Sequence, residues 1–324
     1  MISQLRWPRR RRDTGPAVTM VVPVFGTEEH LGDCLQSLLR QSFRNLEIVV
    51  VDDCSPGDVS GIVGRVAAGD HRVRLVRHET NQGLARVRLT GGREARGRYI
   101  GFVDSDDEVE QWFVQRLHAA AARCDADFVQ CALQQFDPDG ATWVFNRGGA
   151  AHQLRGEEIL RGLLAGAMSN SLCTKLIRNT VWHAATDALD PELQTIYFGE
   201  DLLTMFLVAL HSATFAHIPD AGYRWIRRAT SVTLAAEAHT IAGCLDDLDR
   251  VYRAVHPLLA DRAESPELVA AYFEREYAVV VRQMLLRAAA CDPGETPGLP
   301  ASPAVLGLLG ALALDRIQPA DNGQ

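Results

Sequence analysis

The 324-residue sequence lacks several features that would assign it to a specialised class of protein. Its seven cysteines form no CxxC pair and no even framework, which argues against a disulfide scaffold and a zinc site and is typical of core residues in a reducing cytoplasm. The net charge of −8 argues against general affinity for nucleic acid. A hydrophobic content of 47% suffices for a large core, in one big domain or two small ones.

The sequence also lacks a run long enough to span a bilayer. Its longest uncharged apolar run of note, at 304–314, has 11 residues, whereas a spanning helix needs about 20. The first 15 residues carry five arginines and no apolar stretch, so they are not a secretory signal. We favour a disordered, solvated tail there, with contact to an anionic membrane surface as the alternative. The prediction is a cytoplasmic protein, with peripheral attachment to the inner face of the membrane left open.

Two common nucleotide-binding motifs are missing as well. No GxGxxG turn follows the first predicted strand, which argues against a dinucleotide-binding fold, and the absence of GxxxxGK[ST] excludes a P-loop. Any nucleotide would therefore have to be bound by other means.

The first 125 residues alternate between buried strands and helical stretches. This alternation predicts an α/β fold with right-handed crossovers and a parallel sheet covered by helices on both faces. Predicted strands lie at 18–25, 46–53, 73–78 and 98–104, and predicted helices follow Thr27 and span 84–96. In such sheets, ligands bind outside the carboxyl ends of the strands.

Beyond residue 125 the alternation weakens. Strands are predicted at 126–136 and 141–145, joined by the turn DPDG, and at 213–218 and 222–228. Helices are predicted at 156–166, 197–211, 236–257 and 265–289, the last with Ser265 at its cap and Pro266 in its first turn.

Acidic residues follow two of the predicted strands. Asp52 and Asp53 end the second strand, and Asp104, Asp106 and Asp107 follow the fourth. Because parallel strands end at the same edge, we expect both clusters to face one cleft. Two carboxylates two residues apart suit Mg²⁺ or Mn²⁺, which keep positions open for substrate phosphates. A solvated acidic turn or a helix cap is the alternative, and it suits Asp107 well.

Five segments of the chain carry information through their order and spacing. They are VTMVVPVFGTEEHLGDCLQSLLRQSFRNLEIVVVDDCSPGD, NQGLARVRLTGG, GRYIGFVDSDD, FGEDLLTMFLVAL and YRWIRRATSVT. Their order resembles that of family 2 glycosyltransferases of the GT-A fold, over about residues 18–233. That fold is a Rossmann-like mixed sheet flanked by helices. The resemblance implies transfer of a sugar from a nucleotide donor to an acceptor hydroxyl, with inversion and with Mg²⁺ or Mn²⁺.

The same resemblance implies a donor site. Either Asp53 or Asp52 would accept the imide N–H of the base, which makes UDP the leading donor nucleotide. The departures from the family pattern at Gly26 and Leu89 leave fine donor preference open. The implied contacts are Pro23 and Phe25 along the base, Arg88 near the nucleotide, Asp104 near the ribose and metal, and Asp106 on the metal.

The acidic pair Glu200-Asp201 matches the family's catalytic base, and we assign that role to Asp201. A carboxylate within hydrogen-bond reach can take the acceptor's proton as the new bond forms. A helix N-terminus that favours acids explains the same pair and is compatible with it. Arg227, Arg228 and Ser231 match a loop over the diphosphate, and Lys175 matches a recurring lysine for which a solvated surface charge is the alternative.

We therefore predict a basic tail at 1–15, a GT-A domain at 16–235 and a helical region at 236–324 that shapes the acceptor side or an oligomer contact. The expected partners are a nucleotide-sugar and a saccharide or lipid-linked acceptor, in cell-surface polysaccharide or glycolipid synthesis. Two rivals stay open: a nucleotidyltransferase, although no basic residue follows the first strand, and a non-catalytic sugar-nucleotide-binding module, although the Glu200-Asp201 pair is intact.

Overall fold

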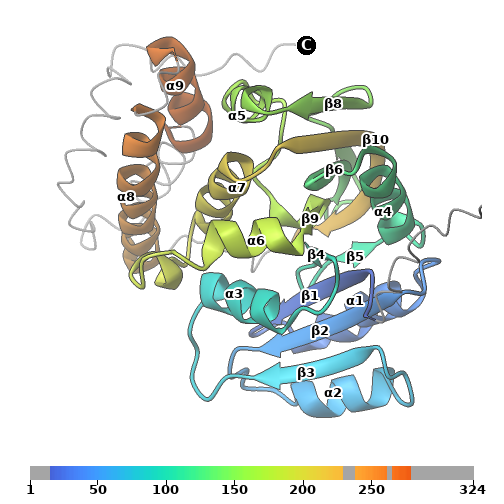
Figure 1. Ribbon diagram of the computed structural model, residues 1–324. Coiled ribbons are helices and arrows are strands. Elements are labelled where there is room, and N and C mark those ends of the chain that lie inside the picture. Colours follow the sequence, from blue (N-terminus) through green and yellow to red (C-terminus); the bar gives the residue numbers. More distant parts are fainter. Residues whose placement is uncertain (1–14, 229–237, 261–264, 279–324) are drawn as a thin grey trace, which may run out of the picture.

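A computed structural model of the chain describes residues 15–228, 238–260 and 265–278 (Figure 1). The tail at 1–14, Ser231, the apolar run at 304–314 and the end of the helix predicted at 265–289 lie outside these ranges. The strands are β1 (Val18–Val24), β2 (Leu46–Asp52), β3 (Val73–Arg77), β4 (Tyr99–Phe102), β5 (Glu108–Val109), β6 (Phe128–Phe136), β7 (Thr142–Phe145), β8 (His152–Arg155), β9 (Lys175–Arg178) and β10 (Thr214–Ile226).

All ten strands join one mixed sheet in the order β3-β2-β1-β4-β9-β6-β10-β5, with β7 added to β6 and β8 to β10. The first four predicted strands are parallel and adjacent, as the alternating pattern indicated. Strand β9 runs antiparallel between β4 and β6 and so joins the parallel half to the rest of the sheet. The predicted mixed sheet flanked by helices is confirmed.

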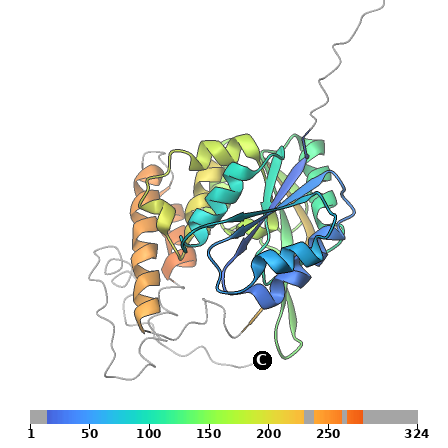
Figure 2. The same ribbon diagram turned by 90° about the horizontal axis from the view of Figure 1, so that it is seen from below.

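Helices cover both faces of this sheet (Figure 2). Helices α1, α2 and α4 lie on one side, and α3, α6 and α7 lie on the other. Helices α1 and α4 follow from apolar spacing, because each buries one stripe of side chains against the sheet. The helices are α1 (Glu28–Leu39), α2 (Val59–Val66), α3 (Leu84–Glu94), α4 (Phe113–Cys124), α5 (Glu157–Leu164), α6 (Asn179–Thr186), α7 (Glu200–Leu210), α8 (Ala238–Ala260) and α9 (Pro266–Phe273).

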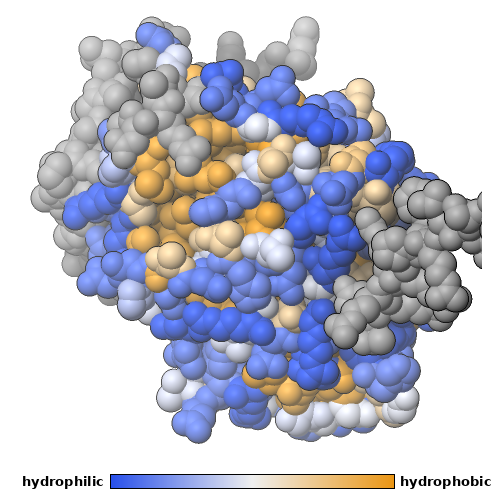
Figure 3. Space-filling model, viewed as in Figure 1, coloured by the Kyte–Doolittle hydropathy of each residue, from blue (hydrophilic) through white to orange (hydrophobic). Residues whose placement is uncertain are grey.

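Helix α7 is apolar nearly all round after its two acidic residues, because it packs against α5, α6 and α8. In the view of Figure 1, apolar surface gathers over this part of the molecule (Figure 3). Within the described ranges, no helix is both long enough and apolar enough to cross a membrane.

Strand β10 differs from its prediction. The two strands predicted at 213–218 and 222–228 are one strand, whose pairing with β6 shifts register between Ile218 and Tyr223. Pro219 lies within the shifted segment, and a proline cannot donate to the ladder. The strand therefore bends, and its second half reaches the edge where β5 lies.

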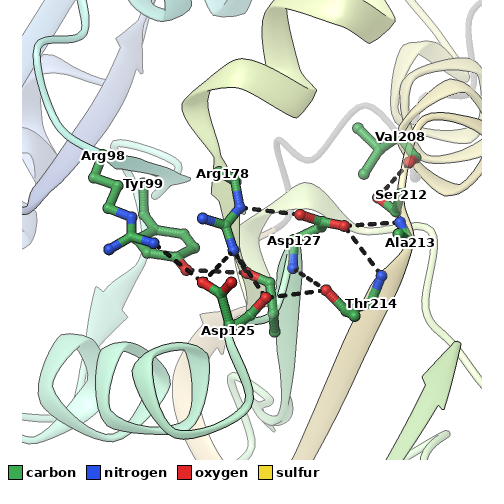
Figure 4. A network of polar contacts seen from close by, with 10 residues as sticks. Arg98, Tyr99, Asp125, Asp127, Arg178, Val208, Ser212, Ala213 and Thr214 are labelled. Carbon is green, nitrogen blue, oxygen red and sulfur yellow. Dashed lines mark hydrogen bonds and ion pairs between the residues drawn. The ribbon is translucent and has the colours of Figure 1, made fainter.

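Asp127 ties the start of β10 to the rest of the sheet (Figure 4). Its carboxylate accepts hydrogen bonds from the backbone N–H groups of Ala213 and Thr214, at 2.7 and 3.1 Å, and from Arg178 Nε at 3.0 Å. The Arg178 guanidinium also lies over the Tyr99 ring, 5.5 Å from its centroid. The Asp127 carboxylate thus connects the start of β6 to β9 and β10, and the Arg178 guanidinium extends this junction to β4.

Two consecutive glycines in α3 permit close packing on both sides of the helix. A Cβ atom at Gly91 would collide with Val21 of β1, and one at Gly92 would collide with the indole of Trp182 in α6. The glycines lower helix propensity, but they let α3 lie directly between the sheet and α6.

Gly92→Ala is therefore expected to destabilise the fold by about 1–3 kcal/mol through overpacking. Gly64→Ala, on the exposed side of α2, is the matched control. A Cβ atom there meets nothing within 4 Å, so it should stabilise by about 0.5–1 kcal/mol. Urea denaturation of both variants would show shifts of opposite sign, and equal shifts would contradict this account of α3.

Candidate active site

The carboxyl ends of β1, β2 and β4 meet at one edge of the sheet. Strand β1 pairs in parallel with both neighbours, with Val24 opposite Asp52 and Val21 opposite Phe102. The two acidic turns that follow β2 and β4 therefore lie on either side of the turn that follows β1. This confirms the sequence-based expectation that the acids share one edge.

Asp104 and Asp106 point outward from this edge, with 37% and 28% of their side chains exposed. The Asp104 carboxylate accepts from Arg88 at 3.0 Å and from the thiol of Cys173 at 3.3 Å. Burial and the nearby Asp104 carboxylate raise the pKa of Asp106. The two carboxylates repel each other and both are accessible to solvent, so a bound cation would reduce their repulsion.

Asp107 points inward and does not cap a helix, so that expectation was wrong. Its carboxylate accepts from the Tyr223 hydroxyl at 2.6 Å and from the backbone N–H of Ile226 at 2.8 Å, and the residue is 3% exposed. Burial and the charge of Asp104 raise its pKa to about 8. Asp107 thus fixes the end of β10 beside the acidic turn.

Arg88 is buried between two carboxylates that come from different elements. Its guanidinium pairs with Asp104, after β4, and with Glu200, at the start of α7. Burial alone would lower the pKa of Arg88, but Asp104 and Glu200 raise it above its ordinary value. The Arg88 guanidinium therefore joins Asp104, which is predicted to lie near the metal, to Glu200, the residue next to the predicted base Asp201.

The Glu200-Asp201 pair opens helix α7, where a helix N-terminus favours negative charge. Glu200 is buried against Arg88, and burial raises its pKa to about 8 even though Arg88 opposes the shift. Asp201 is partly exposed and makes no ion pair in the described part of the chain; burial raises its pKa too, against the effect of Arg88. Of the two carboxylates, Glu200 is committed to Arg88, whereas Asp201 accepts from the backbone N–H of Leu202 at 2.8 Å.

The acidic pair after β2 is less open than expected. Asp53 accepts from the backbone N–H groups of Gln82 and Gly83, at 2.9 and 2.8 Å, and lies 2.6 Å from Nδ1 of His78. It thereby holds the turn that begins α3. Asp52 accepts from the backbone N–H of Ser55, while its buried Oδ2 has no hydrogen-bond donor among the described residues and lies 3.4 Å from Arg77 Nε. A base contact by either residue stays a prediction.

The other residues predicted to contact the donor lie either at the end of β1 or just after β10. Phe25 is 52% exposed beyond the end of β1, where a ring could cover a base, and Pro23 lies within that strand. Arg228 reaches the acidic turn, donating to the carbonyl of Asp106 at 2.6 Å. Arg227 points away and pairs with Asp137 at 3.3 Å, so it is Arg228 that is near the predicted phosphate position.

Lys175 is not a solvated surface charge, because it is fully buried at the start of β9. Its ammonium donates to the carbonyl of Ser171 at 2.5 Å and to the Thr174 hydroxyl at 3.2 Å. Burial lowers its pKa to about 7. Its place behind the site indicates a role in holding the segment that carries Cys173.

Sequence reasoning missed three residues that position the site. Tyr223 donates to Asp107 and accepts from the backbone N–H of Asp104, Cys173 donates to Asp104, and His78 pairs with Asp53. Each comes from a segment that is distant in sequence from its partner. Only the pairing of strands and turns brings them together, so no local pattern could have identified them.

Asp104 and Asp106 fit a divalent cation held by one or two carboxylates plus substrate phosphates. The described residues contain no group of three or more possible metal ligands, so a cation would depend on the substrate for its remaining oxygens. Burial and the Asp104 charge both disfavour the ionised form of Asp106 and raise its pKa, and a cation beside the two carboxylates would offset both effects.

Comparison with known proteins assigns the chain to a family. The family model described as glycosyl transferase family 2 matches residues 19–181, half of the chain. The chain belongs to glycosyl transferase family 2. Among curated relatives, this family 2 chain is 39% identical over 129 residues to the uncharacterized glycosyltransferase EpsJ of Bacillus subtilis (strain 168), covering 40% of the chain and 37% of EpsJ. It is 36% identical over 125 residues to the succinoglycan biosynthesis protein ExoO of Rhizobium meliloti (strain 1021), covering 39% and 34%.

The family 2 chain thus aligns with little more than a third of these relatives' own length. Solved structures match it more completely. The S. aureus TarS 1–349 complex with UDP has a TM-score of 0.56 at 20% identity, covering 84% of this chain and 87% of TarS. The mannosyltransferase PcManGT from Pyrobaculum calidifontis, in complex with GDP-Man and Mn²⁺, has a TM-score of 0.54 at 16% identity, covering 95% and 83%. These likenesses confirm the predicted GT-A fold.

Arg88→Met in this family 2 chain should destabilise the fold by about 3–5 kcal/mol, because it leaves Glu200 buried without its cation. Arg88→Met combined with Glu200→Gln should recover most of that loss. Arg161→Met is the control, because the Arg161–Glu157 pair is more than half exposed on both sides and should be worth about 0.5 kcal/mol. Chemical denaturation at pH 8 tests this, and a loss no greater than the control's would contradict a buried charge bridge.

Proposed function

We propose that this chain transfers a sugar from a nucleotide diphosphate sugar, with UDP as the nucleotide, to a hydroxyl of a saccharide or lipid-linked acceptor, inverting the anomeric carbon. The observation that carries the proposal is the Arg88 bridge, which places the acidic turn of Asp104 and Asp106 beside the Glu200-Asp201 pair. A donor phosphate site and a proton acceptor are needed close together for this reaction. Family 2 membership supports glycosyl transfer as the reaction class.

In this proposal Asp201 takes the proton of the acceptor hydroxyl. As that oxygen bonds to the anomeric carbon, the bond from the carbon to the diphosphate oxygen breaks and UDP leaves. Glu200 is committed to Arg88 and instead fixes the start of α7. The raised pKa of Asp201 makes it a stronger base than an exposed aspartate would be.

Asp106 and Asp104 would hold Mg²⁺ or Mn²⁺, and Arg228 lies next to them to meet the diphosphate. When bound, the cation supplies Lewis-acid stabilisation of charge on the leaving diphosphate. The neighbour PcManGT was solved with Mn²⁺, which supports metal use by this fold.

A uridine donor is supported by the TarS complex with UDP and by the acidic pair Asp52-Asp53. The guanosine donor of PcManGT shows that the fold alone does not decide the base. Relatives such as ExoO support synthesis of a cell-surface polysaccharide as the setting. For residues 1–15, a solvated tail stays the favoured prediction, and contact with the inner face of the membrane stays the alternative.

Asp106→Ala should abolish the metal-dependent part of UDP binding and leave the fold intact, because the side chain is partly exposed and its ion pair with Arg228 is long, at 3.9 Å. Isothermal titration of UDP with Mn²⁺, repeated with excess chelator, measures that part. Asp139→Ala, in an exposed turn away from the site, is the control. Unchanged UDP affinity in Asp106→Ala would refute its assignment to the metal.

Asp201→Asn should leave donor affinity near the wild-type value and lower turnover by on the order of 10²–10⁴. Because the pKa of Asp201 is raised, wild-type kcat should fall with decreasing pH at values above the ordinary aspartate pKa of about 3.9. Asp201→Asn should lose that acid limb, whereas Glu200→Gln should keep it. If Asp201→Asn kept more than about a tenth of the wild-type rate, Asp201 would not be the base.

A further inference from the structure

The hairpin formed by β6 and β7 carries large aromatic side chains that the described part of the fold leaves uncovered. Trp143 is 58% exposed and Phe145 is 49% exposed, whereas ten other aromatic residues in the described part of the chain are buried. The hairpin extends beyond the body of the molecule (Figure 2). These rings therefore contribute little to the core.

The strand register puts these rings on one face with a second tryptophan. Trp143 of β7 and Trp225 of β10 lie on either side of Gln135 in β6. Phe145 is two residues from Trp143, so it is on the same face. Val144, between them, is 60% exposed on the opposite face. We call the first side, with its polar neighbours Asp137 and Arg227, the aromatic face.

The polar groups of the aromatic face are fixed around Asp137. Its carboxylate accepts from the Trp143 indole N–H at 3.1 Å, from Gln135 Nε2 at 2.7 Å and from Arg227 at 3.3 Å. The indole is held in one orientation by this bond. Flat apolar rings beside fixed carboxylate, amide and guanidinium groups can bind a pyranose, since the sugar offers C–H groups on its faces and hydroxyls at its rim.

Strand β10 connects the aromatic face to the candidate active site. Tyr223, two residues before Trp225 and on the same face, donates to Asp107 of the acidic turn. At the end of the strand, consecutive arginines diverge: Arg228 reaches Asp106 and Arg227 reaches Asp137. The aromatic face thus begins next to the place where the donor diphosphate would lie.

We propose that the aromatic face is an acceptor subsite, which binds a pyranose unit of a saccharide chain on Trp143 while the chain's reacting end lies at the acidic turn. This inference rests on the proposed function and names the class of acceptor for the same site. It makes Trp143 a specificity-determining residue with no part in donor binding.

A saccharide fits this face better than a membrane or a second copy of the chain. The turn at its tip, residues 137–140, carries two aspartates, which anionic headgroups would repel. A dry protein contact would leave Asp137 and Arg227 to be desolvated, whereas sugar hydroxyls can hydrogen-bond to both.

The test compares Trp143→Ala with Val144→Ala, which truncates an equally exposed side chain of the same strand on the opposite face. Titration calorimetry of the intact protein, with UDP and Mn²⁺ present, would use cellotetraose, maltotetraose and chitotetraose as probes. At least one should bind the wild type, Trp143→Ala should weaken its affinity about three- to tenfold, and Val144→Ala should stay within about twofold.

Hydrolysis of UDP-sugars without acceptor separates this inference from the proposed function. Both variants should hydrolyse donor at the wild-type rate. If the wild type hydrolysed no UDP-sugar but still bound a saccharide in a Trp143-dependent way, the proposed function would be overturned and the subsite would stand. Equal affinities of the two variants, or no binding of any probe, would overturn the subsite. Light scattering tests self-association through the same face. The subsite would be overturned in favour of self-association if the wild type bound no saccharide and formed a dimer that Trp143→Ala, but not Val144→Ala, converted to a monomer.

Discussion

The buried guanidinium of Arg88 is the interaction on which the arrangement of the site depends. It forms ion pairs with both Asp104 and Glu200. Without Arg88, these two carboxylates would lie partly buried near each other with no cation to balance their charge. Because Arg88 comes from α3, the glycine-permitted packing of that helix against β1 and α6 sets where the bridge lies. The bridge commits Glu200 and leaves Asp201 available, so a structural ion pair decides which acid could act as the base.

Strand β10 is the second organising element. Through Tyr223 and the backbone of Ile226 it anchors the buried Asp107, and through Arg228 it reaches Asp106. The register shift near Pro219 bends the strand so that one element extends from the Asp127 junction to the acidic turn. The proposed donor and acceptor regions would therefore share a single rigid support.

The sequence predicted the parallel half of the sheet and the shared acidic edge, because buried β-branched runs and acids at strand ends are local signals. It missed α2, α4, α6, β5, β8 and β9, whose short or mixed patterns carry little periodicity. It also placed Asp107 at a helix cap and kept a solvated surface charge as the alternative for Lys175. Those outcomes depend on partners more than 100 residues away for Asp107 and on burial by the whole sheet for Lys175. The roles of Asp201, Asp106 and the Asp52-Asp53 pair remain predictions from the resemblance.

The most direct test of the central claim is release of nucleoside diphosphate from a panel of nucleotide sugars by the intact chain with Mn²⁺. A carboxylate that accepts the imide N–H of uracil would face the N3 acceptor of cytosine, at a cost of about 1–3 kcal/mol. The account predicts release from at least one UDP-sugar, and inhibition of it by UDP roughly ten- to a hundredfold stronger than by CDP. Release from no nucleotide sugar would contradict the account of the chain as a glycosyltransferase, and equal inhibition by UDP and CDP would contradict its uridine donor.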